Sequence, residues 1–482
     1  MINRRQFVVA GLATTVAAAS VSETGAAGTT PRLRRDVTKL PTSDPIFAKY
    51  GEAVKRMHGL PVNDQRNWRN QALIHLNYCP HGVSDFFHWH RHYVANFESI
   101  CAQLIGDPAF ALPYWNWSAN KGRIPDPFYD LQNLNVEFWH DPSNASSSNW
   151  GSVSTVGTRN LKKGQGLQDD PRRGGSFTDA AITSIQQESQ FDIYWGGIEG
   201  SPHNNAHVIS GGRTGHIGDG MSPLDPIFWL HHCNVDRLWA QWQAAGNTAP
   251  AVGNNYSGQF VDAAGKPVTN ATSANALDIS QFNYSYDTLS SPIIVTMSQK
   301  LALQPFDKQT VLRPDDVSRT RLTLGVEGTQ KNVASLVETR FSVATKELLP
   351  NLFKSRTFWA PNVLGVQRLA AEPSRVVAHL MQVIAPEDRI PLIVNVFVNC
   401  PYLSPETDSN DQHYAGSFSF FGHPHGHAQG QDFFIDLTRP LRQLAADGRI
   451  ANEQVNVQLM ALPIDPETKA NFSVGSVQLL AV

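Results

Sequence analysis

The sequence predicts a protein of two parts, a mainly α-helical domain followed by a C-terminal β-sandwich domain. Its 482 residues exceed what one hydrophobic core usually supports. Between about Tyr50 and Ala244, apolar residues recur with helical spacing. Beyond about residue 330, short runs rich in β-branched and aromatic residues are separated by turn residues. Such runs are typical of a β-sandwich.

The first thirty residues differ from the rest of the chain. Arg4 and Arg5 precede an apolar, alanine-rich run from Val8 to Ser20. This order is typical of a twin-arginine signal peptide, with an ordinary secretory signal as the alternative. The run is too short to span a bilayer as a helix. We therefore expect residues 1–30 to direct export, and the mature protein to be periplasmic or extracellular without stable membrane association.

The rest of the chain divides where the sequence pattern changes from helical apolar spacing to short β-type runs. Residues 31–300 are assigned to the helical domain, 301–332 to a linker where polar residues dilute the apolar pattern, and 333–482 to the β-sandwich domain. Six strands are expected in the last part. They are Arg375–Ile384, Pro391–Asn399, Tyr414–Phe421, Asp432–Leu437, Val455–Pro463 and Val474–Val482.

The composition is that of an ordinary globular protein. Hydrophobic residues make up 41% and charged residues 17% of the chain, and the net charge is −3. This balance argues against nucleic acids as partners. The four cysteines do not make a disulfide-dense scaffold.

Histidines are concentrated in two blocks of the helical part. The first block contains His75, His81 and His90. The second contains His203 and His207, which fall on one face of a helix, and later His232. One such pair alone is better explained as a buried structural pair. Two triads among apolar and aromatic neighbours are difficult to explain as packing, because each buried imidazole needs a hydrogen-bond or metal partner.

The ligand chemistry favours copper. An all-imidazole site suits copper, zinc, iron or nickel, and neutral ligands without carboxylates suit a metal that cycles between low charge states. A dinuclear zinc hydrolase normally has carboxylate ligands, and neither triad contains one.

Several motifs around these histidines resemble those of tyrosinases and molluscan hemocyanins. The first copper signature is matched by His81, Phe86, Trp89, His90, Arg91 and Glu98, and the second by Asp225, Pro226, Phe228, His232 and Asp236. Further matches are Leu112–Trp117 and the tyrosine motif Tyr284–Asp287. The resemblance covers most of residues 30–290 and implies a helix bundle that holds a dinuclear copper site.

The resemblance also assigns roles to individual residues. It implies two copper ions per chain with dioxygen as co-substrate, the first copper held by His75, His81 and His90 and the second by His203, His207 and His232. Three neighbouring histidines, His88, His92 and His231, are expected not to bind metal, and three charged residues, Arg91, Glu98 and Asp236, are expected to support the ligands.

Three more residues receive a role with an open alternative. Cys79 is expected to form a thioether with His81, a free buried thiol being the alternative. Glu199 and Asn204 resemble a pair that holds a water able to deprotonate monophenols. Both residue types also occur simply as helix caps and polar contacts.

The implied activity is o-hydroxylation of monophenols and oxidation of o-diphenols to o-quinones. A catechol oxidase or aminophenol oxidase without monophenolase activity is one alternative, and a hemocyanin-like oxygen carrier is another. The C-terminal region is similar to that of plant-type polyphenol oxidases, where it covers the active-site entrance of a latent form. Expected partners are small phenols, dioxygen and a copper chaperone.

Overall fold

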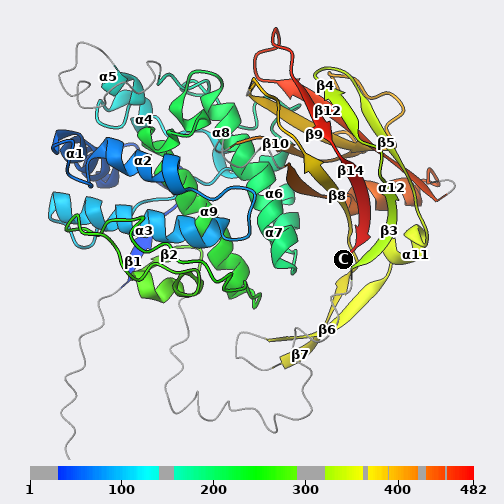
Figure 1. Cartoon of the computed structure of the whole chain (residues 1–482), viewed down its shortest axis with the longest axis horizontal. Helices are drawn as coiled ribbons and strands as arrows, with labels where there is room; N and C mark the ends of the chain where they lie inside the picture. The colour runs from blue at the N-terminus through cyan, green and yellow to red at the C-terminus, as the bar shows by residue number, and fades with distance from the viewer. Residues whose placement is uncertain are drawn as a thin grey trace, which may run out of the picture.

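The computed structural model describes residues 31–140, 157–289, 321–361, 367–388, 390–421, 430–450 and 453–482. Figure 1 shows helices gathered in one part of the molecule and sheets in the other. The signal peptide predicted over residues 1–30 lies outside the described residues, as does the predicted linker up to residue 320.

The N-terminal part is built from helices joined by loops. Its longer helices are α1 (Pro45–Gly59), α2 (Trp68–Tyr78), α3 (Phe86–Ile105), α6 (Asp179–Gln186), α7 (Phe191–Ile198), α8 (Asn204–Gly211) and α9 (Ile227–Ala244). Shorter ones are α4 (Pro127–Asp130) and α5 (Val136–His140), and a π-helical turn, η5 (Glu199–His203), joins α7 to α8.

Local sequence signals set the helix ends. Asp44 accepts a hydrogen bond from the Ile46 amide at the start of α1, and Asn67 does the same for Arg69 at the start of α2. Helix α3 ends at Gly106, whose φ of 70° is left-handed and favours glycine. Nearly the whole of α3 is buried, so it forms the centre of the helical part.

A short parallel pair of strands closes the helical part. Strand β1 (Arg32–Arg34) pairs with β2 (Tyr284–Tyr286), so the two ends of the predicted catalytic domain lie side by side. Figure 1 shows this pair beneath α3.

Two four-stranded antiparallel sheets form the C-terminal part. The first has the order β10-β9-β12-β5, and the second has the order β11-β8-β14-β3. Their strands are β3 (Leu322–Glu327), β5 (Thr339–Ala344), β8 (Val376–Val383), β9 (Leu392–Val398), β10 (Tyr414–Ser419), β11 (Gln431–Asp436), β12 (Gln454–Pro463) and β14 (Ser476–Ala481). Side chains from both sheets, including Phe341, Val394, Leu380 and Leu479, share one buried core. The predicted β-sandwich is confirmed.

Smaller elements complete this part. Two antiparallel two-stranded pairs lie outside the main sheets, β4 (Lys331–Ala334) with β13 (Asn471–Val474) and β6 (Ser355–Pro361) with β7 (Gln367–Pro373). Two helices, α11 (Leu348–Leu352) and α12 (Thr438–Ala446), cover the sandwich.

The six predicted strands correspond to β8, β9, β10, β11, β12 and β14 within a few residues. The predicted linker 301–332 is too long, because β3 lies within it. Leu324 is the one buried side chain of that strand. The strand therefore lacks the alternation of apolar and polar residues that would identify it in the sequence. Among the described residues, no helix is long and apolar enough to cross a bilayer.

Sheet and helices meet along β10 and β11, which lie against η5, α7 and α8. The Phe433 ring packs on Gly200 so closely that a Cβ there would lie 2.7 Å from the ring. Arg173 donates to the Pro463 carbonyl at 2.6 Å, and Asn395 donates to the Arg172 carbonyl at 2.6 Å. The β-sandwich thus rests directly on the turn between the helices that carry the second histidine block.

Candidate metal centre

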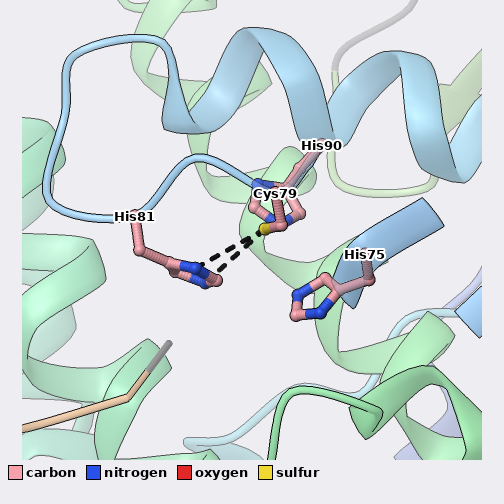
Figure 2. A group of neighbouring side chains, drawn as sticks. All are labelled: His75, Cys79, His81 and His90. Atoms are coloured by element: carbon pink, nitrogen blue, oxygen red, sulfur yellow. Dashed lines mark hydrogen bonds between the residues drawn. The ribbon is translucent and has the colours of Figure 1, made fainter. Parts of the chain in front are cut away.

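The first histidine block forms a compact group of possible ligands. His75 lies in α2, His81 in the loop that follows, and His90 in α3, with Cys79 at the end of α2 (Figure 2). One nitrogen or sulfur atom of each of these four residues lies within 4.8 Å of the others. The structure thus brings together the three histidines that the sequence predicts for the first metal.

The second block forms a matching group. His203 ends η5, His207 follows one turn later in α8, and His231 and His232 are neighbours in α9. One nitrogen of each lies within 4.8 Å of the others, and all four side chains are fully buried. The three predicted ligands are together, but a fourth histidine accompanies them.

The two groups face each other across a narrow space. The rings of His90 and His232 are stacked with centroids 4.2 Å apart, and the rings of His81 and His203 lie 5.8 Å apart. Phe228 lies edge-on to His75, with centroids 5.2 Å apart, and 4.4 Å from His232. This phenylalanine of the second signature therefore spaces one group from the other.

Backbone and side-chain oxygens orient most of these rings through Nδ1. His75 bonds the Gly220 carbonyl at 3.0 Å, His90 the Phe86 carbonyl at 2.7 Å, and His207 the Ile217 carbonyl at 2.5 Å. His203 bonds the Asn204 Oδ1 at 2.9 Å. Such a bond fixes the ring and directs Nε2 towards a metal.

Burial keeps four of the imidazoles neutral. It lowers the pKa of His203 to about 3 and the pKa of His90, His207 and His232 well below the usual value. A neutral imidazole offers a lone pair, whereas an imidazolium does not. Imidazole donors without a carboxylate in either group suit copper.

His231 was expected not to bind metal, and the structure places it inside the second group. Its ring centroid lies 4.4 Å from that of His207 and 5.0 Å from that of His203. Within the described part of the chain, neither ring nitrogen of His231 or of His232 has a hydrogen-bond partner. Geometry alone does not rank the two neighbours, and only the family motif in the sequence distinguishes them.

The other two histidines expected not to bind metal lie outside both groups. His88 bonds the Pro250 carbonyl and His92 the Thr272 carbonyl, each through Nε2 at 2.9 Å. Both rings therefore serve to attach the 250–272 segment to α3.

Cys79 lies between the rings of the first group (Figure 2). Its Sγ is 3.6 Å from Nδ1 and 3.7 Å from Nε2 of His81. An atom equally distant from both ring nitrogens lies in the plane that bisects the ring through Cε1, the carbon that joins them. The same sulfur is 3.2 Å from Nε2 of His90.

Glu199 and Asn204 lie at the two ends of the π-helical turn and are buried. Glu199 accepts a hydrogen bond from the Gly82 amide at 2.7 Å through Oε1, while Oε2 has no partner among the described residues. Burial raises the pKa of Glu199 to about 8. Asn204 is held through its Oδ1 by His203. A π-helical turn is often found at functional sites.

The β-sandwich contributes a residue that the sequence did not single out. Phe421, which follows β10, stacks on His207 with centroids 3.6 Å apart and planes 5° from parallel. Its ring centroid is also 5.3 Å from that of His81 and 5.8 Å from that of His203. Its position next to both histidine groups depends on how the two domains dock, which no local pattern shows.

Charged residues of both signatures support the helices that carry the ligands. Asp236 of α9 accepts hydrogen bonds from Arg91 of α3 at 2.5 Å and from the Tyr284 and Tyr286 hydroxyls at 2.6 Å. Arg34 of β1 lies between Asp236, at 3.3 Å, and Glu98, at 2.8 Å. This cluster fixes α3, α9, β1 and β2 together, and so acts on the imidazoles through their helices.

The start of α9 is fixed in the same way. Asp225 accepts two hydrogen bonds from buried Arg159, at 2.7 and 2.6 Å, and one from the Ile227 amide at 3.1 Å. The aspartate of the second signature is therefore a helix cap that is itself held by an arginine.

Comparison with known proteins agrees with this arrangement. Residues 52–245 match the family described as the common central domain of tyrosinase, and residues 328–481 match a domain of unknown function, DUF7868. A larreatricin hydroxylase of Larrea tridentata is 24% identical over 84% of this chain and 72% of its own length.

Two further relatives align over the helical part. A chloroplastic polyphenol oxidase of Malus domestica is 30% identical over 41% of this chain, and the tyrosinase HcTyr1 of a Hahella strain is 31% identical over 49%. The aligned regions span 38% and 59% of those two proteins.

Solved structures share the fold of both parts. The structure of latent apple tyrosinase has a TM-score of 0.59 with 19% identity and covers 95% of this chain and 98% of its own. A functional unit of octopus hemocyanin has a TM-score of 0.50 with 16% identity over 92% of this chain and 99% of its own.

A helical core with two facing histidine groups defines a type 3 copper protein, and such proteins use a dinuclear copper site with dioxygen. The helical part carries the common central domain of the tyrosinase and polyphenol oxidase family, whose members are oxidoreductases that act on phenols.

Proposed function

We propose that this chain hydroxylates monophenols at the ortho position and oxidises o-diphenols to o-quinones. Bound in the two histidine groups, a copper pair would supply the electron exchange with dioxygen. The observation that carries the proposal is the face-to-face packing of two histidine groups, with the rings of His90 and His232 stacked at 4.2 Å between centroids. The proposed ligands are His75, His81 and His90 for one copper and His203, His207 and His232 for the other.

The proposed role of Glu199 and Asn204 is to hold a water that takes the phenol proton. A phenol has a pKa near 10 and binds a metal best as phenolate. Oε2 of Glu199 is the carboxylate oxygen left over after Oε1 accepts from Gly82. With Oδ1 of Asn204 turned to His203, Nδ2 is the group that can donate to such a water.

The Cys79 geometry supports a thioether to Cε1 of His81. The bond would replace the Sγ–H and Cε1–H hydrogens, with dioxygen as the oxidant that accepts both electrons and both protons. It would fix a ring that lies in a loop rather than on a helix. Intact mass of the copper-loaded protein checks this, because the thioether lowers the mass by two hydrogen atoms. An unchanged mass would leave Cys79 a free thiol.

We also propose that the β-sandwich keeps the protein latent. Phe421 stacks on His207, and its ring centroid lies 5.3 Å from that of His81 and 5.8 Å from that of His203. The ring therefore occupies the space beside both histidine groups that a flat aromatic substrate would have to enter. Mild proteolysis near residues 301–333 is expected to raise phenol oxidation. Unchanged activity after clean cleavage would contradict latency.

Export and copper delivery belong to the same proposal. Arg4 and Arg5 support twin-arginine export, which carries folded proteins, so copper would be loaded before transport with the help of a chaperone. Replacing both arginines by lysine is expected to keep the protein inside the cell. Export of the double variant at the normal level would favour an ordinary secretory signal.

Turnover of tyrosine distinguishes the proposal from its alternatives. Oxidation of tyrosine without an added diphenol supports the hydroxylase. Oxidation of catechols or aminophenols alone supports an oxidase without monophenolase activity. Reversible oxygen binding with neither activity, even after cleavage, would support a carrier like hemocyanin.

A further inference from the structure

Strand β10 makes a polar contact with the turn that carries Glu199 and Asn204. Nδ2 of Asn204 donates to the backbone carbonyl of Ser419 at 2.9 Å. Its neighbour Asn205 donates to the Ser417 hydroxyl at 2.9 Å. Asn204, Asn205 and Ser417 are fully buried. The contact is therefore a sequestered part of the domain interface.

A second strand covers the same turn. The Phe433 ring of β11 lies against Gly200, where a Cβ would approach it to 2.7 Å. Glu199 is 1% exposed and Asn204 is 0% exposed. Both residues proposed to hold the water are thus closed off from solvent while β10 and β11 are docked.

The Ser419 contact competes with the chemistry proposed for Asn204. The amide nitrogen Nδ2 carries two hydrogens, and Oδ1 is already directed to His203. With one hydrogen on the Ser419 carbonyl, the side chain cannot turn towards a water between Glu199 and an incoming phenol without breaking this hydrogen bond. Breaking a buried hydrogen bond costs free energy.

We propose that the Ser419 carbonyl restrains Asn204 and thereby suppresses monophenol hydroxylation separately from the obstruction by Phe421. This inference rests on the proposed function. Phe421 blocks access for every substrate, whereas the Ser419 contact affects only the step that needs the phenol proton removed. Docking of the β-sandwich therefore determines which phenols react as well as whether they enter.

The two effects can be separated because they use different parts of the chain. Phe421 acts through its ring, two residues beyond the backbone carbonyl of Ser419. Phe421→Gly in the full chain removes the ring and leaves β10 in place. Adding Ser417→Glu places a carboxylate at a fully buried position beside Asn205, which forces β10 away from α8.

The experiment compares three full-length, copper-loaded proteins, Phe421→Gly, Phe421→Gly with Ser417→Glu, and Phe421→Gly with Ser419→Ala. The last is the matched control, because the Ser419 carbonyl remains while its hydroxyl has no partner within the described residues. The readout is the ratio of tyrosine hydroxylation to catechol oxidation, both at saturating substrate with a diphenol primer. Circular dichroism checks that each variant folds. If the double variant with Ser417→Glu does not fold, a second protein takes its place. This is Phe421→Gly cleaved by protease near residues 301–333, with both fragments kept in the assay.

We expect the protein with β10 released to have a ratio at least about tenfold higher than Phe421→Gly and the Ser419→Ala control. The reason is that proton transfer by a positioned base contributes about 10²- to 10⁴-fold to a rate. Equal ratios in all three would overturn the inference and leave the proposed function intact. A higher ratio in the Ser419→Ala control would also overturn it. Catechol oxidation without any hydroxylation after release would instead refute the proposed hydroxylase function, and the inference with it.

Discussion

The chain builds its two histidine groups in different ways. The first group draws on two helices and a loop, and a sulfur lies among its rings (Figure 2). The second comes from two helical segments, with His203 and His207 one turn apart and His231 and His232 adjacent in α9. The first is therefore assembled by tertiary contacts, whereas the second is largely fixed by helical spacing.

This difference has a consequence for each group. The first group has three histidines and depends on Cys79 and the Gly220 carbonyl to position His81 and His75. The second has four histidines for three expected ligands. We expect the first group to be sensitive to loss of any histidine and the second to contain one histidine that can be replaced.

Loss of a ligand from the first group should have the largest effect. His90→Ala removes a ring that bonds the Phe86 carbonyl and stacks on His232. Copper should fall from two ions to one per chain, and phenol oxidation should be abolished, because both ions act together. Metal analysis and an oxygen-electrode assay measure this. The control is His92→Ala. His92 lies on the same helix as His90, but its ring bonds the Thr272 carbonyl, so this variant should retain both ions.

Single replacements of His231 and His232 test which of the four histidines in the second group copper does not need. His232→Ala should lose one copper ion, whereas His231→Ala should retain both with affinity reduced by about 10- to 100-fold, as for a residue that only supports a ligand. Copper titration of the metal-free proteins gives both values. If His231→Ala loses an ion and His232→Ala does not, the assignment of the third ligand is wrong.

Both groups depend on the charged cluster beneath them. Burial alone would raise the pKa of Asp236, but Arg91, Arg34 and two tyrosine hydroxyls outweigh it and lower the pKa. Asp236→Asn should cost about 3–5 kcal/mol in the free energy of unfolding, since it leaves buried arginines uncompensated. Urea denaturation of the two proteins measures this.

The pH dependence of the free energy of unfolding tests the contribution of the Asp236 carboxylate. A lowered pKa means that Asp236 stabilises the fold above its unfolded pKa of about 3.9 and loses this contribution as the pH falls towards the folded value. The stability gap between wild type and Asp236→Asn should therefore narrow below about pH 4. Glu406→Gln, at a side chain 82% exposed, should leave stability unchanged at either pH. A constant gap would show that Asp236 acts by packing alone.

The smallest effect is expected at Cys79. Cys79→Ala frees the loop ring of His81 but leaves three histidines, so copper affinity of the first group should fall by about tenfold and the second group should be unaffected. Cys101→Ala, at a buried cysteine of α3, is the control. Loss of affinity in the second group would contradict the separate construction of the two groups.

The sequence was sufficient for elements whose signal is local. Helical spacing gave the His203 and His207 pair, and short runs rich in β-branched residues between turn residues located β8, β9 and β12. The second-block motif selected His232 over its neighbour His231, but the sequence gave no sign that both rings would lie within the second group. Phe421 and the Ser419 carbonyl reach the site only through docking of the two parts, and a contact between residues about 215 positions apart leaves no periodic pattern.

Whether the two facing histidine groups hold a copper pair is tested by the copper content of the purified protein together with its near-ultraviolet absorption after addition of hydrogen peroxide. We expect two copper ions per chain and a strong new absorption band that His90→Ala lacks. One ion per chain, a preference for zinc, or no band in fully copper-loaded protein would contradict this expectation.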